Sequence, residues 1–155
     1  MIELRPTNQQ DLLELFQFQL DKEANYLAAF TSKDPNNKTA YLEKYSKFLG
    51  DPSINNQTIL LDGIIVGSIA KFEIEEKAEI TYWIDRKYWG RGIVSKVLQD
   101  FLKIETIRPI LARVAFDNFG SQKVLEKAGF IKIGQDKGFA NAREEEIIEF
   151  IYRLE

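Results

Sequence analysis

Two glycines separated by one residue, Gly90 and Gly92, stand between a strand-like run and a helix-like run of the sequence. Glycine adopts the left-handed backbone conformation and lets a ligand approach the main chain closely. The first N–H groups of a helix have no intrahelical acceptor, and the helix dipole favours negative charge there. The arrangement therefore predicts a cradle for a pyrophosphate, and the alternative is a tight connection that binds nothing.

The side chains available for catalysis are restricted, because the chain contains no histidine and no cysteine. A histidine base, a thiolate nucleophile, a disulfide and a thiolate metal site are therefore all excluded. Carboxylates, hydroxyls, amides and lysine remain, and they suit a phosphate-bearing substrate that arrives already activated. We expect no metal.

Length and composition indicate one globular domain, residues 1–155, with 45% hydrophobic and 29% charged residues. The net charge of −3 and the mixed signs do not form the basic surface that nucleic acid requires. The sequence has no apolar run of membrane-spanning length, and its first residues do not resemble a signal peptide. We expect a cytoplasmic protein that binds neither nucleic acid nor membrane, either a monomer or a homodimer.

Hydrophobic periodicity and turn signals predict a mixed order of strands and helices. The pair Asp62-Gly63 predicts a two-residue hairpin, and Glu76-Lys77 a second turn, so that three strands form an antiparallel meander. The first half of the chain is predicted to contain strand 2–5, a helix from a cap at Asn8 to about Leu20, a short helix within 21–37, helix 38–49, and strands 58–61, 64–72 and 78–84. The first of these helices should turn Leu12, Leu13, Phe16 and Leu20 inward. The second half is predicted to contain a helix from 93 limited by Pro109, strand 110–116, a helix capped by Asn118 and ending at Gly129, and strands 130–135 and 145–154, with a turn at 138–141.

A strand–helix–strand crossover spans residues 78–116, and such a crossover places two parallel neighbours in one sheet. The fold predicted from the sequence is therefore α/β (α+β). It has a mixed, mostly antiparallel, twisted sheet of six to seven strands with helices on both faces.

Two stretches and the order of the elements resemble the GNAT superfamily of N-acetyltransferases over nearly the whole chain. Residues 82–93, which read YWIDRKYWGRGI, are similar to the YW(I/L)xxxYWGxGI stretch of its ribosomal-protein-type branch. Residues 118–121 and 124–130, which read NFGS and VLEKAGF, are similar to the branch's NxxS…LEKxGF stretch. The resemblance implies the GNAT fold with a splayed central strand pair.

The resemblance also implies acetyl-coenzyme A as cosubstrate and a primary amine, on a small molecule or a protein N-terminus, as acceptor. Transfer then proceeds by direct attack in a ternary complex. The implied cofactor-binding residues are Tyr82, Trp83 and Ile84 along the pantetheine arm, the backbone amides of Gly90, Arg91, Gly92, Ile93, Val94 and Ser95 at the pyrophosphate, and Asn118 and Ser121 beside the arm.

Three positions depart from the pattern of the superfamily. Val94 stands where a small residue is usual, at a site of close approach to the cofactor. Leu125 stands where many relatives have the tyrosine that reprotonates the thiolate, so Ser121 or a water is the expected substitute. Arg113 stands where some relatives carry a glutamate base.

The base must therefore come from elsewhere, because most amines are protonated at neutral pH and one proton has to be removed. Glu79 is our first candidate, since strand alternation puts it on the same face as Thr81 and Trp83. Glu73 is the second candidate. The alternative for Glu79 is a solvated glutamate paired with a lysine.

The segment 23–31 lies where the family builds the acceptor wall, and Asn25, Tyr26 and Phe30 are the candidate substrate-binding residues. The alternative is that Tyr26 and Phe30 pack under the sheet. The mild negative charge favours a cationic amine. Two other functions remain open at this level: a non-catalytic acyl-coenzyme A-binding module of the same fold and, with less support, a dinucleotide-binding domain.

Overall fold

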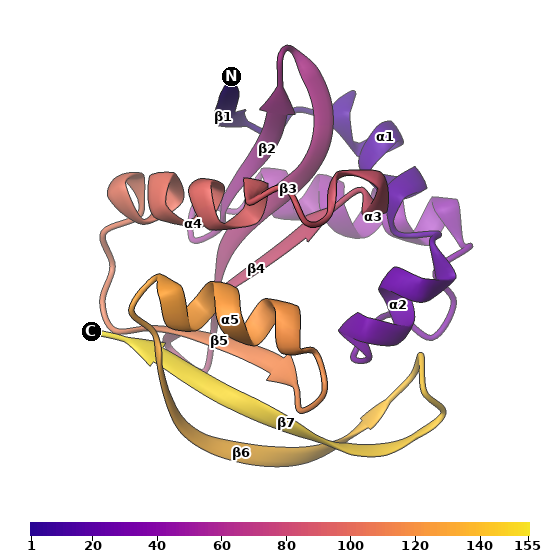
Figure 1. Cartoon of the computed structure of the whole chain (residues 1–155). Helices are drawn as coiled ribbons and strands as arrows, with labels where there is room; N and C mark the ends of the chain where they lie inside the picture. Colours follow the sequence, from indigo (N-terminus) through magenta and orange to yellow (C-terminus); the bar gives the residue numbers. More distant parts are fainter.

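The computed structural model describes all 155 residues as a seven-stranded sheet, in the order β1-β2-β3-β4-β5-β7-β6, with helices on both faces (Figure 1). This confirms the α/β fold predicted from the sequence. The elements are β1 (Ile2–Pro6), α1 (Asp11–Phe18), α2 (Lys22–Ala28), α3 (Lys38–Leu49), β2 (Asn55–Leu61), β3 (Ile64–Ile74), β4 (Lys77–Ile84), the short 3₁₀ helix η1 (Arg86–Tyr88), α4 (Ile93–Ile104), β5 (Ile110–Ala115), α5 (Phe119–Lys127), β6 (Ile131–Ala140) and β7 (Glu145–Leu154).

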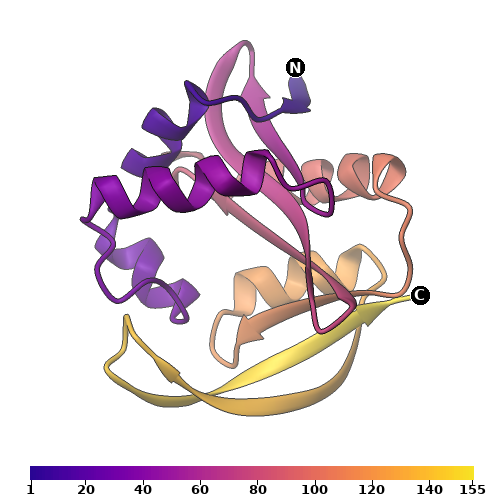
Figure 2. The same cartoon turned by 180° about the vertical axis from the view of Figure 1, so that it is seen from behind.

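The helices divide between the two faces of the sheet. Helices α4 and α5 lie in front of it in Figure 1, and α3 lies in front when the molecule is seen from behind in Figure 2. The main core forms beneath α4, where Ile80 of β4 packs with Val97 and Phe101. No helix has the length and apolar character needed to cross a lipid bilayer.

Two tight turns connect the meander of β2, β3 and β4. Asp62 and Gly63 have φ values of 50° and 81°, as the predicted hairpin requires. The second turn uses Glu75 and Glu76, with φ values of 52° and 64°, and Lys77 already begins β4. It therefore lies one residue before the predicted position, because two left-handed residues form the turn and Lys77 pairs with Ile74.

Helix α1 begins with a reciprocal pair of hydrogen bonds. The Asp11 amide donates to Asn8 Oδ1 at 3.0 Å, and the Asn8 amide donates to Asp11 Oδ2 at 2.9 Å, so Asn8 closes the turn before the helix. The N-cap itself is Gln10, whose side chain makes no cap hydrogen bond, so the predicted cap lies two residues too early. The predicted inward face is wrong at Leu13, which is 49% exposed. Leu15 is buried in its place, because positions three and four residues apart share a helix face.

The hairpin of β6 and β7 is longer than predicted. Residues 138–140 continue β6 instead of turning, and the turn occupies residues 141–144. Ala140 pairs with Glu145 and is fully buried beside Ala29, so burial at the end of α2 extends the strand past the glycine that suggested a turn.

Candidate active site

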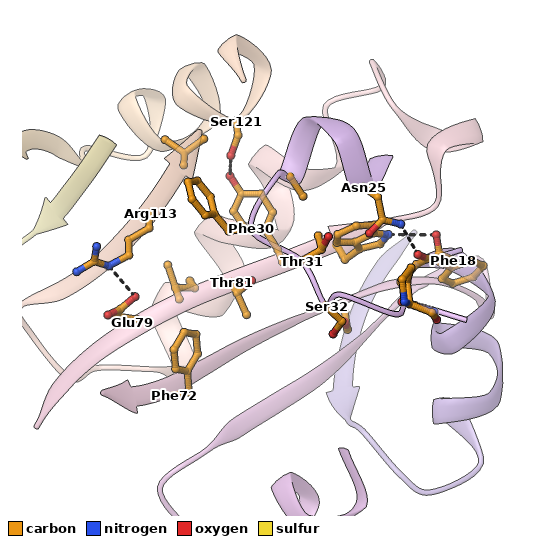
Figure 3. A pocket seen from close by; sticks show the side chains of 18 of the residues that line it. Phe18, Asn25, Phe30, Thr31, Ser32, Phe72, Glu79, Thr81, Arg113 and Ser121 are labelled. Carbon is orange, nitrogen blue, oxygen red and sulfur yellow. Dashed lines mark hydrogen bonds and ion pairs between the residues drawn. The ribbon is translucent and has the colours of Figure 1, made fainter. Parts of the chain in front are cut away.

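Strands β4 and β5 are parallel neighbours that stay together over only two register pairs, Ala78 with Ile110 and Glu79 with Leu111. Beyond these pairs the strands diverge, which confirms the predicted splayed pair. A cavity of about 700 Å³ lies at this divergence (Figure 3). The predicted site residues whose side chains line it are Asn25, Phe30, Glu79, Tyr82, Trp83, Asn118 and Ser121.

The loop before α4 has the backbone geometry of a cradle. Gly90 and Gly92 have φ values of 77° and 73°, and a Cβ added at either would meet no atom within 4 Å. Glycine is needed here for its conformation and not for space. The amides of residues 90–95 donate to no acceptor within the chain, so six successive N–H groups are free to bind an anion.

The side chains around this loop leave the amides accessible. Val94, the bulky departure from the family pattern, packs against the main core. Trp89 Nε1 donates to the carbonyl of Ile84 at 3.1 Å and ties the loop to the end of β4. The Arg91 guanidinium lies 5.4 Å from the centre of the Tyr88 ring. The bulk of valine is therefore directed away from the predicted pyrophosphate position.

Two hydroxyl groups meet on the face of the sheet that α4 and α5 cover. The Tyr82 hydroxyl of β4 lies 2.6 Å from Ser121 Oγ of α5. Burial raises the pKa of Tyr82 to about 12, although the hydrogen bond to Ser121 opposes the shift. The Tyr82 hydroxyl is thus protonated at physiological pH, and either hydroxyl of the pair can be the donor. The Ser121 amide donates to Asn118 Oδ1 at 3.3 Å, which confirms Asn118 as the cap of α5.

A charged cluster lies on the opposite face of the sheet, at the end of the cavity where β4 and β5 are still paired. Arg113 Nε of β5 lies 3.5 Å from Glu79 Oε1, and Arg113 Nη1 lies 3.3 Å from Glu149 Oε1 of β7 and 3.0 Å from Asp136 Oδ2 of β6. Figure 3 shows Glu79 and Arg113 turned toward each other. Glu79 is therefore neither solvated nor paired with a lysine, because it is only 5% exposed.

Glu149 is the site residue that the sequence reasoning missed. Burial raises the pKa of its carboxyl; Arg113 opposes the shift, and the negative charges of Glu79 and Asp136 add to it. Alternation along the predicted strand 145–154 could indicate which face Glu149 occupies. No sequence signal indicates that β7 lies beside β5.

The predicted acceptor residues separate in the structure. Phe30 and Asn25 both line the cavity. The side chain of Asn25 also donates to the carbonyl of Gln19 at 2.5 Å, so it is already engaged within the protein. Tyr26 is 52% exposed, and its ring lies 4.1 Å from the Arg143 guanidinium outside the cavity. The structure thus does not bring Tyr26 to the acceptor wall, because the exposed face of α2 carries it.

Helix α3, which the sequence predicted as helix 38–49, supplies an aromatic wall of the cavity. The ring of Tyr41 lies 5.2 Å from that of Phe16 and 4.4 Å from that of Tyr45, centre to centre. Both tyrosines line the cavity, and burial raises the pKa of each. Trp83 Nε1 closes this side by donating to the carbonyl of Phe18 at 3.3 Å.

The remaining predicted residues lie away from the cavity. Glu73 is exposed, and its carboxylate lies 3.8 Å from Lys71 Nζ. The side chain of Ile84 belongs to the main core, so only its backbone could meet a ligand. No group of three or more acidic, histidine or cysteine side chains is arranged to hold a metal ion.

The fold and the split sheet define a class of α/β acyltransferases, and comparison with known proteins agrees. Residues 2–131 match the family model of the acetyltransferase (GNAT) domain, and the chain belongs to this family. It is an acetyl-coenzyme A-dependent N-acetyltransferase, and acetyl-coenzyme A is its cosubstrate.

Two curated relatives are distant in sequence. YwnH of Bacillus subtilis strain 168, named as a phosphinothricin acetyltransferase, is 27% identical over an alignment of 138 residues, and the match covers 87% of this chain and 70% of YwnH. YdaF of the same strain, named as a ribosomal N-acetyltransferase, is 28% identical over an alignment of 101 residues, and the match covers 59% of this chain and 55% of YdaF.

Among solved structures, that of RimL, a ribosomal L7/L12 alpha-N-protein acetyltransferase in complex with coenzyme A, has a TM-score of 0.84 at 20% identity. The match covers 99% of this chain and 93% of that one. The similarity to YdaF and RimL agrees with the resemblance to the ribosomal-protein-type branch.

Proposed function

We propose that the split between β4 and β5 receives the acyl chain of acetyl-coenzyme A, and that the amides of residues 90–95 hold its diphosphate. One observation carries this proposal: six successive amides without a protein acceptor lie at the end of the strand whose other edge has lost its partner. The helix dipole of α4 adds to the attraction for phosphate. The open edge of β4 at Tyr82, Trp83 and Ile84 offers backbone groups to the pantetheine amides.

The acceptor enters from the face covered by α1 and α3. Phe30 and Tyr41 line this part of the cavity, and Glu79 lies at its charged end. A primary amine fits because its hydrocarbon part meets aromatic rings while its ammonium group meets a carboxylate. The finer choice between a small molecule and a protein N-terminus depends on how far an acceptor extends beyond this cavity.

The chemistry is thioester aminolysis. Glu79 takes a proton from the ammonium group, and the free electron pair of nitrogen forms the C–N bond to the acetyl carbon. The tetrahedral adduct then breaks its C–S bond and loses a second proton, and the departing sulfur gains one through Ser121. Holding both reactants in one cavity supplies up to about 7–11 kcal/mol of the barrier reduction.

The proposal is tested by two measurements on the wild-type chain. Calorimetric titration with coenzyme A measures binding, and thiol release from acetyl-coenzyme A measures transfer to a panel of primary amines and N-terminal peptides. We expect saturable binding, and thiol release that depends on the amine. Coenzyme A that fails to bind at millimolar concentration would contradict the proposed cradle, and binding without turnover on any amine would favour the non-catalytic module.

Ser121→Ala separates the role of the hydroxyl from that of the cavity. We expect coenzyme A affinity to change little, while kcat falls by about tenfold or more, because donation to the sulfur at the bond-breaking step is lost. Ser46→Ala, at a hydroxyl on α3 that accepts a hydrogen bond from Gln9 and does not line the cavity, is the matched control. An unchanged kcat in Ser121→Ala would exclude the serine as the donor.

A further inference from the structure

The charged end of the cavity holds more negative than positive charge. Glu79 and Glu149 have side chains only 7% and 16% exposed, and both face the same guanidinium, that of Arg113. Asp136, the third carboxylate on Arg113, is 61% exposed and is balanced in part by solvent. One guanidinium can neutralise one of the two enclosed carboxylates, and an enclosed charge without a partner is costly.

The cavity end is therefore one positive charge short, and a protonated amine supplies that charge. We infer that Glu149 is a second proton-accepting carboxylate of this site, which shares the proton of the acceptor amine with Glu79 across Arg113. This inference rests on the proposed function, because it assigns a further catalytic residue to the same reaction. It also explains why Glu149 is enclosed on β7 when the exterior of that strand is available to a charged residue.

The surroundings of Glu149 suit this role. Arg113 on β5, Glu79 on β4 and Asp136 on β6 are the charged groups nearest to it, and Asp34 and Lys44 line the cavity from the side of α3. Burial and the two neighbouring carboxylates raise the pKa of Glu149 against the effect of Arg113. A carboxylate with a raised pKa accepts a proton at neutral pH more readily than an ordinary one.

The proton balance of the reaction explains the use of two carboxylates. The ammonium group loses one N–H proton before attack and a second after the C–N bond has formed. One of these protons ends on the sulfur of coenzyme A, and the other reaches solvent. Either carboxylate can accept the first proton, because Glu79 and Glu149 both line the cavity that the amine enters.

The test uses Glu149→Gln, Glu79→Gln and the double variant, with an amine that the wild type acetylates. We expect Glu149→Gln to lower kcat by about 10- to 100-fold, with unchanged coenzyme A affinity, because general base catalysis contributes about 10²–10⁴-fold in all. The double variant should lose less than the product of the two single losses, since groups that act as a unit are not additive.

The pH profile of kcat separates proton transfer from a structural role. Activity should rise with pH through the raised pKa of Glu149 in the wild type. In Glu79→Gln this acid limb should move to lower pH, because the neighbouring charge that raises the Glu149 pKa is gone. Glu146→Gln is the control, since Glu146 lies on the same strand but is exposed and paired with Lys137.

Two results would overturn the inference. The first is a wild-type kcat in Glu149→Gln. The second is a Glu149→Gln variant whose KM for the amine is raised while the acid limb of its kcat–pH profile is unchanged. A third measurement needs no acceptor. Carbon-13 NMR titration of the glutamate carboxyls should show a Glu149 signal whose pKa lies above the ordinary value and falls in Glu79→Gln. If the pKa of Glu149 has its ordinary value and does not change in Glu79→Gln, the inference is contradicted. If instead no amine is a substrate, the proposed function is contradicted, and the NMR titration still tests the inference.

Discussion

The two edges of β4, an interior strand of the sheet, differ in how far they are paired. Toward β3 the strand is paired over eight register positions, from Gly67 with Ile84 to Ile74 with Lys77. Toward β5 it is paired over two. The first edge holds the strand in place, and the second exposes it to a ligand. The cavity of the candidate active site thus forms where the pairing between β4 and β5 ends.

This difference separates residues that stabilise the fold from residues that serve the site. On the paired side, backbone atoms approach so closely that a Cβ at Gly67 would lie 2.2 Å from the carbonyl oxygen of Trp83. On the open side, a Cβ at Gly92 would meet nothing within 4 Å. We expect substitutions on the first side to change stability and substitutions on the second to change binding.

The largest expected effect is that of Asp11→Ala, at the start of α1, among the residues that stabilise the fold. Both oxygens of Asp11 accept from Arg5, at 2.6 and 2.8 Å, and Oδ2 also accepts from Thr58 of β2 at 2.9 Å. Arg5 is 37% exposed and can turn to solvent, so the loss comes mainly from the buried Thr58 hydroxyl, which loses its acceptor. We expect a loss of about 3 kcal/mol of unfolding free energy, measured by urea denaturation. Coenzyme A affinity of the folded protein should not change. Asp100→Ala, at an exposed ion pair with Lys96, should cost less than about 1 kcal/mol.

Gly67→Ala should have the next largest effect. Its new methyl group forces β3 away from the Trp83 carbonyl, and such overpacking costs about 1–3 kcal/mol. Gly134→Ala on β6 is the matched control, because its Cβ would meet no atom within 4 Å. Equal stability of the two variants, in urea denaturation, would show that the close approach of β3 and β4 does not constrain this position.

Gly92→Ala should reduce the free energy of unfolding less than Gly67→Ala does, but should weaken the binding of coenzyme A more. Alanine at φ of 73° is strained by about 1 kcal/mol, and the strain turns the α4 amides away from one another. We expect coenzyme A to bind about tenfold more weakly, equal to ~1.4 kcal/mol, in calorimetric titration. Gly63→Ala, at φ of 81° in the β2–β3 hairpin, carries the same strain and should bind normally. Equal affinity of the two variants would argue against the cradle.

The smallest effect concerns acid pH. Burial would raise the pKa of Asp11, but hydrogen bonds from Arg5, the Asn8 amide and Thr58 outweigh it and lower the pKa below the ordinary 3.8. A group with a lowered folded pKa stabilises the protein above its unfolded pKa and loses this contribution as the pH falls through the folded value. Urea denaturation below pH 4 should therefore show falling stability. The slope should flatten in Asp11→Asn but not vanish, because Arg143 also lowers the pKa of Asp117.

Local signals predicted most of the fold. The glycine at position 63, the cap at Asn118 and the start of a helix at residue 93 each depend on neighbours within a few residues, and all three are found as expected. Predictions failed where distant contacts override local preference. Leu13 is exposed, and Leu15 is buried where Leu13 was expected. Strand β6 continues through Gly138 because Ala140 is buried beside Ala29 at the end of α2.

The candidate site divides in the same way. The sequence by itself determined the glycine loop, the absence of histidine and cysteine chemistry, and the family, because these depend on residue type and short spacing. Only the tertiary structure decided that Glu149 joins Glu79 at Arg113 and that Tyr26 lies outside. These contacts join β4, β5 and β7, whose order in the sheet is set by packing among segments far apart in the chain; Arg113 and Glu149, for example, are 36 positions apart. Side-chain distances across a sheet have no signature in the spacing along one strand.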